Sequence, residues 1–115
     1  MEEIKARTKK FALKIVRTFT VLPKTTEAQV IGKQFLRSGT SVGAHCHEGF
    51  RARSKNEFVA KIDLGIQELA ETIYWLDLLV LAEILPAETI DKITHEANEL
   101  MSILVTISKN TKSKS

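Results

Sequence analysis

Cysteine, proline and glycine are scarce in this 115-residue sequence, which has one Cys, two Pro and five Gly. A single Cys excludes an intramolecular disulfide framework and a zinc site built from several cysteines. So few Pro and Gly residues provide few turns, which argues against a β-sandwich or a β-barrel. The longest apolar run, residues 73–85, contains Asp77 and Glu83 and is too short to cross a bilayer. Since no secretory signal is visible either, we expect a cytoplasmic protein with no membrane partner.

The composition is that of one globular domain, with 43% apolar and 27% charged residues. The charge is divided along the chain, because residues 1–24 carry seven Lys or Arg and two Glu, whereas residues 62–108 carry one Lys and nine acids. Such a division is found where a protein contacts nucleic acid. It also arises where basic and acidic helices of one bundle, or of neighbouring subunits, attract each other. The sequence lacks an arginine-rich run, which favours the second explanation.

Apolar residues recur every three or four positions along four segments, which predicts four amphipathic helices. The first runs from about Glu3 to Leu22, and Pro23 ends it because proline lacks an N–H and disfavours helical geometry in the residue before it. Either Thr25 or Thr26 is positioned to cap the second helix.

The second half of this second helix, SGTSVGAHCHEG, is rich in small residues. Gly39 and Gly43 lie four positions apart and therefore share one face. A glycine inside a helix costs about 1 kcal/mol relative to alanine, and close approach of another backbone offsets that cost. We therefore predict a continuous helix with a close contact at Gly39 and Gly43; the alternative is a loop that begins near Ser38.

A capping-box pattern at Ser54 and Glu57 opens the third helix at Lys55. No proline interrupts the following segment, so we predict a helix to about Leu85. From Ile73 onward two faces of this helix are apolar, and a four-helix monomer covers only one of them. The surplus predicts an interface with another subunit.

The fourth helix is predicted to hold Pro86 in its first turn and to end near Ser108. Four amphipathic helices with short connections predict an all-α fold, an antiparallel up-down-up-down four-helix bundle. We assign residues 1–108 to this single domain and residues 109–115 to a flexible basic tail.

The segment 45–48, His-Cys-His-Glu, is the cluster that most resembles a metal or nucleophile site. His45 and Glu48 are three positions apart and share a helix face, whereas His45 and His47 point to different sides. Cys46 lies on the apolar stripe and has no evident group to orient an attacking thiolate, so we predict a core residue.

A second pair of carboxylates, Glu68 and Glu71, shares a face as general acid and base groups do. Nothing in the sequence places this pair in a pocket, so solvated carboxylates or salt bridges at an interface are the simpler predictions. Phosphate-binding and dinucleotide-binding glycine motifs are absent, as is the HExxH zinc motif. We therefore predict no enzymatic activity, no catalytic residue, no metal and no cofactor.

Residues 41–58, SVGAHCHEGFRARSKNEF, resemble the signature of a bacterial family of four-helix bundles, the 23S rRNA intervening-sequence proteins. That family reads S-x-P/G-A-N-x-x-E-G, an aromatic residue, a basic turn and S-x-x-E-F. Glu68, Glu71, Tyr74 and Trp75 resemble the E-x-x-E-T-x-Y-W-L stretch of one branch. The resemblance extends from about residue 5 to residue 107, although His45 stands where the family usually has Asn.

The resemblance implies a ring-like homopentamer with no established enzymatic activity. A related protein, the accessory variability determinant of diversity-generating retroelements, is a basic pentamer that binds nucleic acid and a reverse transcriptase. Nine residues are assigned to an oligomer interface or to the family motif: Gly39, Gly43, His45, Glu48, Gly49, Glu68, Glu71, Tyr74 and Trp75.

Seven basic residues are candidates for contact with RNA or DNA: Lys9, Lys10, Lys14, Arg17, Arg51, Arg53 and Lys55. The start of the first helix is expected near the turn before the third, where the last three of them lie. The sequence shows no aromatic stacking platform, which predicts weak, sequence-tolerant binding. We interpret the chain as a non-enzymatic homo-oligomer that binds nucleic acid or acts as an adaptor. The alternative is a purely structural or protein-interaction oligomer without a nucleic-acid partner.

Overall fold

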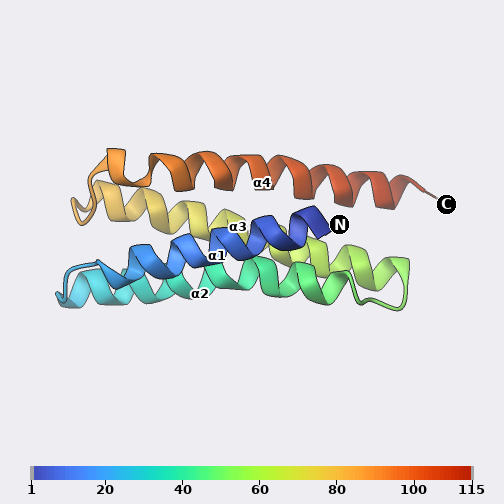
Figure 1. Ribbon diagram of the computed structural model, residues 1–115, viewed down its shortest axis with the longest axis horizontal. Coiled ribbons are helices and arrows are strands. Elements are labelled where there is room, and N and C mark those ends of the chain that lie inside the picture. Colours follow the sequence, from blue (N-terminus) through green and yellow to red (C-terminus); the bar gives the residue numbers. More distant parts are fainter. Residues whose placement is uncertain (1, 115) are drawn as a thin grey trace.

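A computed structural model describes residues 2–114 as four helices joined by short loops (Figure 1). The helices are α1 (Glu2–Thr20), α2 (Thr26–Gly49), α3 (Lys55–Leu81) and α4 (Ala87–Ser113). Each packs against its neighbour in sequence, and α1 also meets α4, within a body of 50 × 20 × 19 Å. The predicted all-α antiparallel bundle is confirmed. Met1 and Ser115, the first residue of the predicted domain and the last of the predicted tail, lie outside the described residues.

The helix starts follow the predicted capping residues. The backbone N–H of Ala28 donates to Thr25 Oγ1 at 3.3 Å, so Thr25 caps α2. The N–H of Glu57 donates to Ser54 Oγ at 3.1 Å and caps α3. The Glu57 carboxylate accepts from the N–H of Arg53 at 3.4 Å, so the return bond of the capping box is displaced by one residue.

The predicted apolar stripes form the core. The large, fully buried apolar side chains come from all four helices: Phe11, Ile15, Phe35, Val42, Ile62, Leu69, Leu76, Leu79, Leu100 and Leu104. Burial of each such side chain favours folding by about 1.5–3 kcal/mol, so this inner face determines the bundle.

The small-residue half of α2 is helical and lies close to α1, as predicted. A Cβ atom added to Gly39 would lie 2.7 Å from Ile15 Cγ1, and one added to Gly43 would lie 3.2 Å from Thr8 Cβ. Thr8 is buried, but its hydroxyl donates to the carbonyl oxygen of Ile4 at 2.9 Å. The buried Thr8 hydroxyl is therefore satisfied within α1, so the close approach of α2 costs no hydrogen bond.

The end of α3 differs from the prediction, because the helix stops at Leu81 rather than near Leu85. Glu83 adopts a positive φ of 59°, and the N–H of Ile84 donates back to the carbonyl oxygen of Leu79 at 2.9 Å. This left-handed cap reverses the chain and returns Leu85 to the core, where it is 7% exposed. Pro86 is accordingly the N-cap of α4 and not part of its first turn.

The end of α4 also differs, because the helix continues five residues past Ser108 to Ser113. The Ser108 hydroxyl donates to Asp63 Oδ1 at 2.7 Å, and Lys112 Nζ lies 3.1 Å from Asp63 Oδ2. These contacts with α3 stabilise the last turns. Residues 109–113, assigned to a flexible tail, are therefore helical. No helix within residues 2–114 is both long enough and apolar enough to span a membrane.

Candidate interaction surfaces

A polar network follows the outer seam between α2 and α3. Arg37 Nη1 lies 3.2 Å from Glu68 Oε2, and Arg37 Nη2 forms an ion pair with Glu71. Trp75 Nε1 donates to Glu71 Oε2 at 2.9 Å. The hydrogen bonds from Trp75 and Arg37 lower the pKa of Glu71, so its carboxylate is ionised at neutral pH.

The network continues through His45 to the turn between the two helices. His45 Nδ1 lies 3.2 Å from Glu48 Oε1, and His45 Nε2 lies 3.7 Å from Glu68 Oε2. Lys61 Nζ lies 3.7 Å from Glu48 Oε1. The seam network therefore brings together five of the family-motif candidates, His45, Glu48, Glu68, Glu71 and Trp75.

The chemistry of the seam network is ion pairing between two helices of the same chain. Both ring nitrogens of His45 face carboxylates, and Arg37 lies between the carboxylates of Glu68 and Glu71. Across residues 2–114 no group of three or more His, Cys, Asp or Glu side chains is arranged to hold a metal ion. Of the roles predicted for Glu68 and Glu71, solvation or salt bridging at an interface, the structure shows salt bridging, between two helices of one chain. Sequence reasoning missed Arg37 because its partners lie 31 and 34 positions away.

Cys46 is a core residue, as predicted. Its side chain is fully buried, and a Cβ atom added to Gly65 of α3 would lie 3.3 Å from its Sγ. Burial raises the pKa of the Cys46 thiol to about 11. The thiol is therefore protonated at neutral pH, which makes it a poor nucleophile.

Ion pairs also join the basic helix α1 to the acidic helix α4. Arg7 Nη2 lies 2.7 Å from Glu96 Oε1 and 2.8 Å from Glu99 Oε1. The hydrogen bond from Arg7 holds the pKa of Glu99 below its usual value. Attraction between basic and acidic helices of one bundle, one explanation for the divided charge, is therefore present.

The seven basic residues proposed to contact nucleic acid are all exposed. Among residues 2–114 none of the seven takes part in an ion pair, in contrast to Arg7, Arg37, Lys61 and Lys112. The seven candidates are therefore among the positive charges that the bundle does not neutralise, as are Lys24, Lys33 and Lys92.

The structure divides these seven residues into two patches and one separate side chain. Arg51, Arg53 and Lys55 form the turn patch between α2 and α3; Lys10, Lys14 and Arg17 form the α1 patch. Lys5 Nζ lies 5.8 Å from the ring centroid of Phe50, which confirms that α1 begins near this turn. Because a helix rises 1.5 Å per residue, the end of the α1 patch lies about 18 Å farther along.

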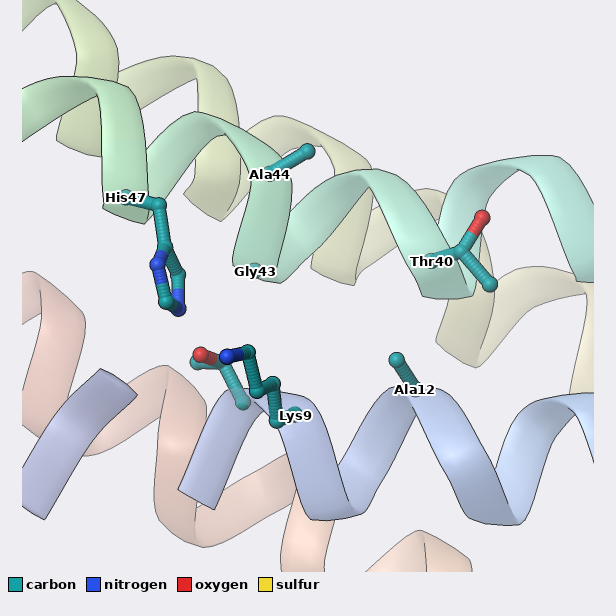
Figure 2. A pocket seen from close by; sticks show the side chains of 7 residues that line it. Lys9, Ala12, Thr40, Gly43, Ala44 and His47 are labelled. Carbon is teal, nitrogen blue, oxygen red and sulfur yellow. The ribbon is translucent and has the colours of Figure 1, made fainter. Parts of the chain in front are cut away.

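Lys9 lies apart from both patches, beside a hollow between α1 and α2 (Figure 2). The hollow has a volume of about 190 Å³ and is lined by Thr8, Lys9, Ala12, Thr40, Gly43, Ala44 and His47. His47 reaches from α2 toward α1, and its buried Nε2 has no hydrogen-bond partner among the described residues (Figure 2). The hollow was not predicted from the sequence, although the small residues Gly43 and Ala44 indicate that α1 can approach α2 here.

The outer side of α3 exposes large apolar side chains. Tyr74 is 59% exposed and Leu81 is 79% exposed. The ring of Tyr74 meets that of Trp75 edge-on, with centroids 5.0 Å apart and an interplanar angle of 76°. The predicted surplus of apolar surface is therefore present at Tyr74 and Leu81, whereas Leu79 and Leu85, which belong to the same apolar stretch, are buried in the core.

Comparison with known proteins places these features in a family. Residues 2–106 match the family described as 23S rRNA-intervening sequence protein. The chain is also similar to a crystal structure of a protein of unknown function from the S23 ribosomal protein family of Bacteroides thetaiotaomicron VPI-5482. The TM-score is 0.87 with 35% sequence identity, over 92% of this chain and 98% of that chain. No curated protein matches the sequence.

Proposed function

Because the chain belongs to the 23S rRNA-intervening sequence protein family, we propose that it is a non-enzymatic, homo-oligomeric module that binds structured RNA or DNA weakly. The family and the similar crystal structure are of unknown function and are not known enzymes. Five copies per oligomer are proposed from the family resemblance. The polar clusters of the chain support this interpretation, because the seam network is used for helix pairing and Cys46 is protonated in the core.

The observation that carries nucleic-acid binding is the unequal pairing of positive charges. Arg7 and Arg37 are held by carboxylates of α4 and α3. Among the described residues no side chain of the turn patch or the α1 patch forms an ion pair, although Glu48 and Glu57 lie beside the turn patch. Unpaired Lys and Arg side chains gain counterion-release free energy when they contact phosphates. In an oligomer both patches repeat in every copy, so weak contacts add through multivalency.

The test is fluorescence anisotropy of a labelled RNA hairpin, titrated with the protein at several salt concentrations from about 50 mM upward. The triple substitution Arg51→Ala, Arg53→Ala and Lys55→Ala should lower affinity. It should also flatten the dependence of log affinity on log salt, by about one unit for each phosphate that the variant no longer neutralises.

The matched control is the triple substitution Lys24→Ala, Lys33→Ala and Lys92→Ala, which removes the same charge from exposed positions outside both patches. This control should retain most of the affinity. Equal decreases in affinity in the two triple variants would mean that only net charge matters and would contradict a role for the turn patch.

The second candidate function is a structural or protein-interaction oligomer with no nucleic-acid partner. The intrachain ion pairs of Arg7 and Arg37 and the exposed side chains of Tyr74 and Leu81 support it. Failure of the wild-type oligomer to bind RNA or DNA hairpins at about 50 mM salt would favour this candidate.

A further inference from the structure

We infer that the turn patch also reads the base of an unpaired nucleotide, with the carboxylates of Glu48 and Glu57 selecting guanine. The site is a second hollow, the turn hollow, beside the loop that joins α2 to α3 at one end of the bundle (Figure 1). This inference rests on the proposed nucleic-acid binding and names the nucleotide that the same surface takes.

The turn hollow is built by consecutive segments of one chain. Its volume of about 590 Å³ lies within the range of about 300–1,000 Å³ that is usual for small-ligand sites. Its lining comes from the last turn of α2, the loop and the first two turns of α3: Glu48, Arg51, Arg53, Glu57 and Lys61. Glu57 and Lys61 are four positions apart and share one face of α3. Cations and carboxylates therefore line the same hollow.

The cations of the turn hollow are free to bind a ligand. Within residues 2–114 the guanidinium groups of Arg51 and Arg53 take part in no ion pair. Lys61 Nζ lies 3.7 Å from Glu48 Oε1, which is longer than a hydrogen bond. A guanidinium group can hold a phosphate by paired hydrogen bonds or stack its plane on a base, so two arginines can serve both parts of a nucleotide.

The carboxylates distinguish this hollow from a plain phosphate site, because a carboxylate repels phosphate and can only accept hydrogen bonds. Glu57 Oε2 accepts from the N–H of Arg53 at 3.4 Å, and Glu48 Oε1 faces His45 and Lys61. The other oxygen of each carboxylate, Glu57 Oε1 and Glu48 Oε2, has no partner among the described residues. A ligand that complements the whole hollow therefore carries N–H donors as well as negative charge.

A guanine nucleotide combines these groups. Along its Watson–Crick edge guanine presents two adjacent donors, N1–H and the N2 amino group, and one carboxylate can accept both in parallel. Adenine and cytosine present an amino group beside a ring-nitrogen acceptor, and uracil presents one N–H between two carbonyl oxygens, so their lone pairs repel the carboxylate. A base in a single-stranded loop exposes this edge, whereas pairing occupies it. The prediction of sequence-tolerant binding rested on the missing aromatic platform and left these carboxylates out of account.

The test compares three labelled RNA hairpins that differ at one position of a uridine loop, which holds guanosine, adenosine or inosine. Inosine keeps the N1–H of guanosine but lacks the 2-amino group, so it isolates the second hydrogen bond. Affinity is measured by fluorescence anisotropy at about 50 mM salt. The wild type should bind the guanosine hairpin at least about fivefold more tightly than the adenosine hairpin, as one bidentate contact to a base provides, with inosine in between.

The variant carries Glu48→Gln and Glu57→Gln, which remove both negative charges and keep the side-chain length. Glutamine also suits the capping-box position that Glu57 occupies. This variant should lose the preference for guanosine, yet bind the adenosine hairpin at least as tightly as the wild type, because less negative charge then faces the phosphates.

The matched control carries Glu27→Gln and Glu88→Gln. These exposed acids lie in the first turns of α2 and α4, at the other end of the bundle from the turn hollow (Figure 1). The control should keep the preference for guanosine, and circular dichroism checks that both proteins are folded.

Four results would overturn the inference while leaving nucleic-acid binding intact. They are equal affinity of the wild type for the three hairpins, a preference that survives in the Glu48 and Glu57 variant, an equal decrease for all three hairpins in that variant, and loss of the preference in the control. Failure of the wild type to bind any hairpin would instead reject the proposed function, and this inference with it.

Discussion

Gly43 of α2 packs directly against Thr8 of α1, with room for no more than a strained methyl group between them. A Cβ atom at this position would lie 3.2 Å from both Cβ and Oγ1 of Thr8. Four residues earlier the helices are closer still, because a Cβ on Gly39 would lie 2.7 Å from two carbon atoms of Ile15. The two glycines therefore set how closely α1 approaches α2.

Gly43→Leu should destabilise the fold by about 1–3 kcal/mol, the usual cost of overpacking a core. Gly39→Ala should be more destabilising than Gly43→Ala, because the β-branched Ile15 has little freedom to move away. Alanine also gains about 1 kcal/mol of helix propensity, so Gly43→Ala should be close to neutral. Urea denaturation at fixed protein concentration measures the free energy of unfolding of all three variants. If Gly39→Ala were as stable as Gly43→Ala, or more stable, this packing would be contradicted.

The mass of the wild-type protein in solution should be several times the 12.9 kDa of one chain. The exposed fractions of Tyr74 and Leu81 motivate an oligomer, and the family resemblance motivates five copies. Light scattering over a concentration series gives the number of chains per oligomer directly. A monomeric protein at micromolar concentration would contradict this prediction.

Stability should fall with decreasing pH in a way that depends on Glu71. The hydrogen bonds from Trp75 and Arg37 place the pKa of Glu71 in the folded state below the ordinary value of 4.5. Its contribution is therefore fully present above pH 4.5 and is lost as the pH falls through the folded-state pKa. Glu71→Gln should lower the urea midpoint at pH 7 and approach the wild type in acid. A difference in urea midpoint between the wild type and Glu71→Gln that stays constant with pH would exclude this linkage.

Cys46 should react slowly with thiol reagents in the folded protein. Burial raises the pKa of the thiol to about 11, so at pH 8 little thiolate is present and the sulfur is inaccessible. Modification monitored by mass spectrometry should be much faster in concentrated urea than in buffer. Equal rates in both solutions would show that the α2–α3 interface opens freely.

The sequence predicted the helices well where local chemistry determines them. Thr25, Ser54 and Pro23 act within one turn of their own positions, and the apolar stripes need only a periodicity of 3.6 residues. The early end of α3 was missed because Glu83 adopts a left-handed conformation, and the residue at such a helix end is usually a glycine. The extension of α4 was missed because Asp63, on another helix, stabilises it.

The candidate surfaces were predicted less completely for a related reason. His45 and Glu48 are three positions apart, so the sequence alone pairs them. Arg37 joins Glu68 and Glu71 only once the register between α2 and α3 is fixed. The hollow depends likewise on how α1 crosses the small residues of α2, which a periodic pattern does not specify.

The packing of each helix on its neighbour in sequence has a kinetic consequence. The pairs α1–α2, α2–α3 and α3–α4 each need only a short loop to close, and α2–α3 is the most extensive of them. Domains dominated by such local pairings fold in microseconds to milliseconds, because little loop-closure entropy is lost before tertiary packing forms. The meeting of α1 with α4 through Arg7 joins the two ends of the chain and carries the largest loop-closure cost. We therefore expect the α2–α3 hairpin to form early in folding and the α1–α4 edge to close last and open first.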